Sequence, residues 1–329
     1  MPRVSVLMCV HDGERYLRQA VDSILAQTLT DFEFVVVDDG STDSTAVILG
    51  GYTDARIVRL KNESNVGLTR SLNRGLAAAS GEYVARQDAD DVSLPARLEQ
   101  QVHFLDSRPA YGLVGSAFAY LDHNGHVMEM VCPLTKSCDL KVGLLVTNWF
   151  THGAVMLRRS CLDQTGGYRA LFKYAQDYDL WLRLAERYEV ANLPLVLYQY
   201  RVANDSISVR KHAEQEAYAN LARECARRRR AGEVEELDAL LNWLMSGRTL
   251  TRKTVNGKKQ LSLRSYLYAR SLFSQDQLEA ARVYFLRSLW DDPWRVHAWG
   301  YVAATLAPVG LVEKLRGPIR RLRALGNRD

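Results

Sequence analysis

The first 80 residues alternate between short apolar runs and segments with helical spacing, and this alternation constrains the fold more than any other feature. The apolar runs are residues 4–10 (VSVLMCV), 32–37 (FEFVVV) and 56–60 (RIVRL). Between them, apolar residues recur at helical spacing in residues 14–27 and 68–76. Short strands that alternate with helices predict an α/β fold in which helices flank a mostly parallel sheet.

Acidic residues follow two of the predicted strands. Asp38 and Asp39 close the second run, and Asp88, Asp90 and Asp91 follow a further run at residues 83–85. Because the carboxyl ends of parallel strands meet at one edge of a sheet, we expect the two clusters to share that edge. Two carboxylates about 4 Å apart repel by roughly 4 kcal/mol at an effective dielectric constant near 20. A bound Mg²⁺ or Mn²⁺ would relieve this repulsion, and the alternative is a solvated acidic turn before a helix.

A third acidic position lies later in the chain, in the segment Gln176-Asp177-Tyr178-Asp179-Leu180-Trp181. Leu180, Trp181 and Leu184 have helical spacing, which places Asp177 at or near the start of a helix. An Asp at this position commonly caps the helix, and a functional carboxylate is the other interpretation.

Three stretches of the chain resemble glycosyltransferase family 2, whose members have the GT-A fold. They read VSVLMCVHDGERYLRQAVDSILAQTLTDFEFVVVDDGSTD, NVGLTRSLNRGLAAASGEYVARQDADD and GGYRALFKYAQDYDLWLRL, in the order and spacing of the family. The resemblance covers roughly residues 2–208 and implies a catalytic domain over residues 1–210. A helical domain over residues 211–329 would follow it.

The resemblance implies a nucleotide site at the first two strand ends. Asp39 would accept a hydrogen bond from the base, and Asp38 would support its loop. The backbone at Val10 and His11 would line the same pocket, and Arg70 would approach the nucleotide. For Asp39 the alternative is a turn residue, and for Arg70 it is a solvated helix residue.

The resemblance also implies a site for the sugar, the diphosphate and a metal ion. Asp88 and Asp90 form the D-x-D motif of the family, in which Asp88 would face the ribose or sugar and Asp90 would hold Mn²⁺ or Mg²⁺ on the diphosphate. Asp91 would be a second metal ligand or a loop anchor. Arg201 matches the YR element and would approach the diphosphate, or else pair with a nearby carboxylate.

In the family, the residue that matches Asp177 is the general base. It would take a proton from the acceptor hydroxyl while the hydroxyl attacks the anomeric carbon from the face opposite the diphosphate, which inverts that carbon. The family usually has Glu before this Asp, and this chain has Gln176.

From residue 211 the sequence has helical periodicity, with helices expected at 211–231, 233–246, 262–274, 276–290, 294–306 and 311–325. The last of these has an apolar stripe, and residues 311–328 contain six basic residues against Glu313 alone. A basic amphipathic helix of this kind predicts binding to an anionic membrane surface, and the alternative is a helix packed on its neighbours. No basic motif with interleaved aromatic residues supports nucleic-acid binding.

The composition, 47% hydrophobic and 25% charged, is typical of a soluble globular protein. No run of 18 apolar residues is present, and five cysteines without a CxxC pair favour reduced thiols in the cytosol. We therefore expect a cytoplasmic enzyme, and the basic amphipathic helix would attach it to the inner face of the plasma membrane.

The expected function is an inverting glycosyltransferase that uses a nucleotide sugar, with UDP-sugar as the expected donor and a glycan or lipid-linked glycan as acceptor. Two alternatives remain open from the sequence. One is an inactive regulator that binds nucleotide sugars, and the other is a sugar nucleotidyltransferase, for which CVHDGERY is a poor phosphate loop.

Overall fold

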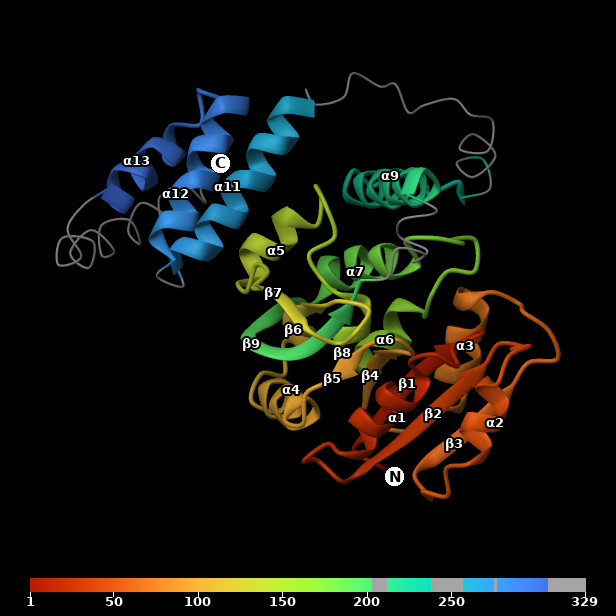
Figure 1. Ribbon diagram of the computed structural model, residues 1–329. Helices are drawn as coiled ribbons and strands as arrows, with labels where there is room; N and C mark the ends of the chain where they lie inside the picture. The colour runs from red at the N-terminus through yellow and green to blue at the C-terminus, as the bar shows by residue number, and fades with distance from the viewer. Residues whose placement is uncertain (203–211, 238, 240–256, 275–276, 307–329) are drawn as a thin grey trace. The chain divides into compact units, whose positions relative to one another are not determined.

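The computed structural model describes residues 1–202, 212–237, 239, 257–274 and 277–306 (Figure 1). The chain divides into two compact units, Met1–Leu250 and Thr251–Asp329. Helix α9 (His212–Arg230), which follows the domain boundary predicted at residue 210, packs on α7 (Gln176–Arg187) within the first unit. The boundary itself stays a prediction.

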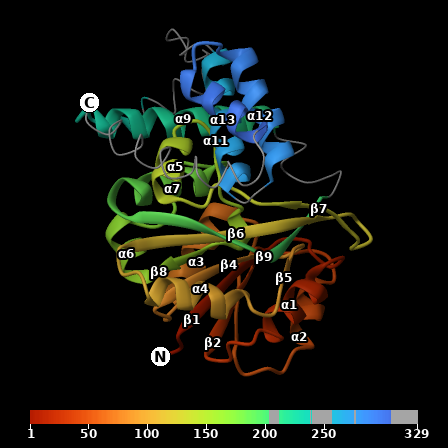
Figure 2. The ribbon, with the colours of Figure 1, turned by 90° about the vertical axis from the view of Figure 1, so that its left-hand side faces the viewer.

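The described part of the first unit contains a nine-stranded sheet with the order β3-β2-β1-β4-β8-β6-β9-β5, and β7 pairs with β6 at its side. Its strands are β1 (Val4–Val10), β2 (Phe32–Asp38), β3 (Ile57–Lys61), β4 (Tyr83–Asp88), β5 (Val92–Ser93), β6 (Tyr111–Leu121), β7 (Val127–Val131), β8 (Met156–Arg158) and β9 (Glu189–Arg201). Strands β1 to β4 are mutually parallel, and the long strands β6 and β9 lie side by side (Figure 2).

Helices flank this sheet as the alternation predicts. They are α1 (Leu17–Leu25), α2 (Thr45–Gly50), α3 (Leu68–Ala78), α4 (Arg97–Asp106), α5 (Ser137–Gly143), α6 (Arg159–Thr165) and α7, with a short 3-10 helix η1 (His152–Ala154). Helix α1 shows why they form: its positions 17, 20, 21 and 24 lie on one face and are fully buried against the sheet.

The predicted α/β fold class is confirmed, and the three predicted N-terminal strands lie within one residue of β1, β2 and β3. The sheet is mixed, because β4–β8, β6–β8, β6–β7 and β5–β9 are antiparallel pairs. The helix predicted over 14–27 is shorter, since the chain turns through Asp12 (φ 50°) and becomes helical only at Leu17.

The described part of the second unit contains three helices, α11 (Gly257–Ser274), α12 (Leu278–Asp291) and α13 (Val296–Leu306). Their inner faces meet around Phe285 and Tyr301, whose rings stack with centroids 4.8 Å apart. The helices predicted near 262–274, 276–290 and 294–306 are therefore confirmed. The predicted amphipathic helix 311–325 lies outside the described residues. No helix in the described ranges has the length and apolar character needed to span a membrane.

A contrast between two glycines tests this packing. A Cβ on Gly81, at the turn before β4, would lie 2.5 Å from the backbone nitrogen of Ser5, whereas a Cβ on Gly50 would meet nothing within 4 Å. Gly81→Ala should therefore lower the free energy of unfolding by about 1–3 kcal/mol, because backbone must move. Gly50→Ala at the end of α2 should change it by no more than about 0.5 kcal/mol or raise it slightly. Urea unfolding of both variants measures this, and equal midpoints would contradict the packing described.

Candidate functional site

The loops that follow β1 and β2 are joined by hydrogen bonds at the carboxyl edge of the sheet. The Asp39 backbone nitrogen donates to the Val10 carbonyl at 2.8 Å, and the His11 ring nitrogen Nδ1 lies 3.1 Å from the Asp39 carbonyl. The Asp12 carboxylate accepts from the Thr42 nitrogen at 2.7 Å. The structure therefore brings Val10, His11 and Asp39 together, as the sequence predicts for a nucleotide pocket.

The carboxylates of Asp38 and Asp39 are both buried and bonded within the protein. Asp38 accepts from the Ser41 nitrogen at 2.9 Å. Asp39 accepts from Asn62 Nδ2 at 2.6 Å and from the backbone nitrogens of Val66 and Gly67 at 3.0 Å. Burial alone would raise the pKa of Asp39, but these hydrogen bonds outweigh it and hold the pKa below its usual value.

Asp39 therefore fixes the loop that leads into α3, at whose first turn Arg70 is exposed. Contact of Asp39 or Arg70 with a nucleotide stays a prediction.

The acidic loop after β4 rests on buried positive charge. Asp88 Oδ1 forms an ion pair with Arg86 at 2.7 Å, and the Arg86 side chain is only 1% exposed. The Asp88 backbone nitrogen donates to the Tyr198 hydroxyl at 3.2 Å. Burial and the neighbouring Asp88 charge raise the pKa of Asp90 to about 6.

Asp91 and Arg201 hold this loop from the other side. Asp91 is buried, and its Oδ1 accepts from the Arg201 backbone nitrogen at 2.7 Å. Burial, followed by the charges of Asp90 and Asp88, raises the pKa of Asp91 well above its usual value. The buried Arg201 guanidinium donates to the Asp90 carbonyl at 2.9 Å and lies over the Tyr16 ring at 4.3 Å. Both side chains are oriented as loop anchors in this structure, and their predicted ligand roles stay untested.

Asp177 lies in the first turn of α7, directly after Ala175, whose backbone is left-handed (φ 52°). No side chain caps this helix, so the capping alternative has no hydrogen bond to support it. Instead, Asp177 Oδ2 accepts from Asn148 Nδ2 at 3.0 Å. The Asn148 Oδ1 in turn accepts from the Phe150 nitrogen at 3.1 Å, which points the amide group of Asn148 toward the carboxylate.

The charges of the acidic loop and of Asp177 both act on His152, in η1. Burial and the Arg86 charge lower the pKa of His152, while Asp177 and Asp88 both oppose that shift. Its Nε2 lies 3.0 Å from the Tyr168 hydroxyl. A Cβ on the next residue, Gly153, would lie 2.8 Å from Asp88 Oδ2, so η1 is packed against the acidic loop. The charges of Asp88 and Asp177, which come from different parts of the sequence, thus act on the same imidazole.

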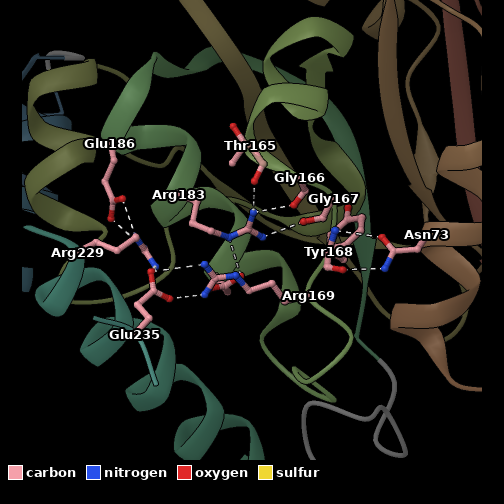
Figure 3. A network of polar contacts seen from close by, with 11 residues as sticks. Asn73, Thr165, Gly166, Gly167, Tyr168, Arg169, Arg183, Glu186, Arg229 and Glu235 are labelled. Carbon is pink, nitrogen blue, oxygen red and sulfur yellow. Dashed lines mark hydrogen bonds and ion pairs between the residues drawn. The ribbon is translucent and has the colours of Figure 1, made fainter. Parts of the chain in front are cut away.

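The loop of residues 166–172, which precedes Asp177, is fixed by side chains of α3 and α7 (Figure 3). Arg183 on α7 donates to the carbonyls of Thr165, Gly166 and Gly167 at 2.8–2.9 Å. Asn73 on α3 bonds both the nitrogen and the carbonyl of Tyr168. The loop is therefore held to the same helix that carries Asp177.

Buried and half-buried ion pairs continue this network to α9 (Figure 3). The pairs run Arg183–Asp179 (2.9 Å), Asp179–Arg169 (3.5 Å), Arg169–Glu235 (2.5 Å), Glu235–Arg229 (2.8 Å) and Arg229–Glu186 (2.7 Å). Positive and negative groups alternate along the chain of contacts, which lets three guanidinium groups lie close together. Asp179 is fully buried here and pairs with both Arg183 and Arg169.

Sequence reasoning missed Arg86, Asn148 and Tyr198. An arginine inside the apolar strand YVARQD was the one available signal, because a buried guanidinium requires acceptors. Nothing near Asn148 or Tyr198 in the sequence indicates a contact with Asp177 or the Asp88 backbone.

Within the described ranges, no three His, Cys, Asp or Glu side chains converge into a site that could hold a metal ion by themselves. Mg²⁺ commonly takes one or two protein carboxylates and completes its shell with phosphate oxygens and water. The metal role of Asp90 stays a prediction.

The chain matches the family model described as "Glycosyl transferase family 2" over residues 5–178, more than half of its length. EpsE of Bacillus subtilis (strain 168) is 36% identical over 216 residues, which cover 64% of this chain and 76% of EpsE. The amylovoran biosynthesis glycosyltransferase AmsE of Erwinia amylovora is 34% identical over 212 residues, 63% of this chain and 79% of AmsE. The O-antigen biosynthesis glycosyltransferase WbnJ of Escherichia coli is 31% identical over 212 residues, 62% and 81% of the two chains.

Solved structures share the fold at low identity. TarS 1-349 of S. aureus, solved in complex with UDP-GlcNAc, has a TM-score of 0.58 at 18% identity and covers 96% of this chain and 92% of its own. The mannosyltransferase PcManGT of Pyrobaculum calidifontis, solved with GDP-Man and Mn²⁺, has a TM-score of 0.53 at 20% identity, with 92% and 86% covered. These neighbours are GT-A transferases, and together with the family model they identify an enzyme. The chain belongs to glycosyltransferase family 2.

Proposed function

We propose that this enzyme is a metal-dependent, inverting glycosyltransferase that moves a sugar from a UDP-sugar to a hydroxyl group of a glycan or lipid-linked glycan. The donor class is supported by the structural neighbours solved with UDP-GlcNAc and GDP-Man. The acceptor class is supported by relatives named for the biosynthesis of amylovoran and O-antigen.

The observation that carries the proposal is that η1 connects the acidic loop with the loop that precedes Asp177. A Cβ on Gly153 would lie 2.8 Å from Asp88 Oδ2, and the Nε2 of His152 lies 3.0 Å from the Tyr168 hydroxyl. The charges of Asp88 and Asp177 both act on the His152 imidazole. A donor sugar that is held at the acidic loop would therefore present its anomeric carbon toward the carboxylate that activates the acceptor. Direct sugar transfer requires that the donor sugar and the general base lie close together.

The donor end takes its charges from the acidic loop. Asp90 would hold the Mn²⁺ or Mg²⁺ ion, and the ion would stabilise the negative charge that the diphosphate gains as it leaves. Asp88 is fixed by Arg86 and would accept hydrogen bonds from hydroxyl groups of the ribose or sugar. Val10, His11, Asp38, Asp39 and Arg70 would contribute the nucleotide pocket, and Arg201 would hold the loop in place.

At the acceptor end, Asp177 would accept the proton of the attacking hydroxyl. Asn148 donates to Oδ2, and a carboxylate has a second oxygen, Oδ1, with which it can accept the hydroxyl proton. The hydroxyl oxygen forms its bond to the anomeric carbon as the bond to the diphosphate oxygen breaks, which inverts that carbon. The loop of residues 166–172 is tied to α7, so it would hold the acceptor at a constant position relative to Asp177.

The metal role of Asp90 is tested by thermal unfolding with UDP in the presence and absence of Mn²⁺. A ligand at 100 times its dissociation constant stabilises a protein by about 2.7 kcal/mol, and we expect UDP to raise the melting temperature only with the metal. Asp90→Ala should remove this dependence, whereas Asp163→Ala, on the exposed face of α6, should keep it. Equal stabilisation by UDP in excess EDTA would show that no metal links Asp90 to the diphosphate.

The role of Asp177 is tested by Asp177→Asn, which keeps the size of the side chain and removes the base. Turnover should fall by roughly 10²–10⁴-fold while the affinity for UDP stays near that of the wild type. Wild-type turnover in this variant would refute the assignment.

The two alternative functions are distinguished by assays of the wild-type protein. A protein that binds UDP-sugars without transfer would be a regulator, and release of pyrophosphate from a nucleoside triphosphate and a sugar phosphate would identify a nucleotidyltransferase.

Asn148 is a positioning residue in this proposal, because it acts through Asp177. Asn148→Ala should lower kcat by about tenfold, the loss of one hydrogen bond to a charged group, and leave KM for the donor unchanged. A double-mutant cycle separates this role from a general loss of structure. In the Asp177→Asn background, Asn148→Ala should cost little further activity, and full additivity of the two losses would contradict the proposed coupling.

A further inference from the structure

Three tryptophans are exposed at one turn of the second unit. Trp290, Trp294 and Trp299 are 88%, 88% and 54% exposed, and they are half of the tryptophans of the chain. A large side chain of this kind is seldom left in water without a function, because its burial is strongly favourable. We call these three residues the tryptophan turn.

The tryptophan turn continues the outward faces of two helices. Trp290 shares one face of α12 with Val283 and Leu286, at helical spacing, and all three are exposed. Trp299 shares a face of α13 with the exposed Val296, and its indole nitrogen donates to the Pro293 carbonyl at 3.1 Å. The opposite faces of both helices form the core around Phe285 and Tyr301. The exposed apolar face is therefore additional to the face that the unit needs in order to fold.

The charge of this unit indicates the kind of partner. Residues 251–329 contain 15 lysines and arginines against six aspartates and glutamates, whereas residues 1–250 contain 28 against 32. The second unit thus carries an excess of nine positive charges on a chain whose net charge is +5. An anionic partner is attracted to such a unit, and a second copy of the same unit is repelled.

We propose that the tryptophan turn inserts into the interface of an anionic lipid bilayer and that the basic residues of the unit bind its headgroups. Indole rings favour the headgroup level of a membrane because one edge is polar and the body is apolar. The neighbouring Val283, Leu286 and Val296 favour hydrocarbon over a polysaccharide, whose surface is covered with hydroxyl groups. The proposal deepens the proposed function, since it would place the enzyme beside lipid-linked acceptors, but lipid binding is measured independently of sugar transfer.

The test uses the full chain with vesicles of phosphatidylcholine alone and vesicles that also contain phosphatidylglycerol. We expect sedimentation with the anionic vesicles at low salt, and quenching of tryptophan fluorescence by bromine atoms on the acyl chains. The double variant Trp290→Ser/Trp294→Ser should have a partition coefficient to the anionic vesicles at least about tenfold lower, because each inserted tryptophan adds to partitioning. It should also lose the quenching. Val47→Ser, which changes an exposed apolar residue of α2, is the matched control and should bind like the wild type.

Three results would overturn the proposal. Absence of wild-type binding at low salt excludes a membrane surface. Equal binding and quenching by the double variant would mean that charge alone attaches the chain. A concentration-dependent dimer that the double variant loses, seen by light scattering, would assign the face to a second copy. Transfer to a short soluble acceptor, measured on the same samples, should be equal in all variants. Its absence in the wild type would reject the proposed function and leave the lipid result intact.

Discussion

Three buried arginines under three aspartates are the arrangement on which the rest of the site depends. Arg86, Arg97 and Arg201 are at most 2% exposed, and they lie beneath or beside the loop that carries Asp88, Asp90 and Asp91. The sequence suggested that either solvent or a divalent ion must relieve the repulsion of this loop. In the structure, the protein itself relieves part of this repulsion, because fixed guanidinium groups offset part of the negative charge of the three aspartates. The offset is incomplete at Asp90 and Asp91, because burial and the neighbouring carboxylates still raise the pKa of Asp90 to about 6 and the pKa of Asp91 well above its usual value.

The same arrangement gives Asp88 and Asp90 different structural environments, so their substitutions should have different structural costs. Arg86 is buried and pairs with Asp88, so removal of Asp88 would leave an uncompensated charge inside the protein, which typically costs 3–5 kcal/mol. A loss of activity after substitution of Asp88 would therefore combine lost binding with lost structure. Among the described residues, no arginine or lysine forms an ion pair with the Asp90 carboxylate. The Asp177 carboxylate is held by a neutral amide, that of Asn148. These two positions report on chemistry with less structural disturbance.

Sequence periodicity predicted the α/β class and strands β1 to β3, because each has a buried face or a continuous apolar run that a short window reveals. It did not predict the antiparallel pairing of β8 with β4 and β6, since that register depends on contacts more than 40 residues apart in the sequence. The same limit applies to the site. The family motifs predicted roles for Asp39, Asp88 and Asp177, but not that Asn148 would donate a hydrogen bond to Asp177. The family match ends at residue 178, so no motif indicated that Arg229 would pair with Glu186 of α7.

Those later contacts explain how the proposed base is held. Helix α7 carries Asp177 and Asp179 in its first turn, Arg183 one turn later, and Glu186 near its end. Arg183 takes three successive carbonyls of the preceding loop, and Glu186 pairs with Arg229 of α9. A shift of the loop alone would leave a buried guanidinium without acceptors, so the loop and the first turn of α7 are held together. The acidic loop is fixed separately by Arg86 and Arg201. If the donor binds at the acidic loop and the acceptor beside Asp177, as we propose, buried arginines hold the protein on both sides of the reacting bond.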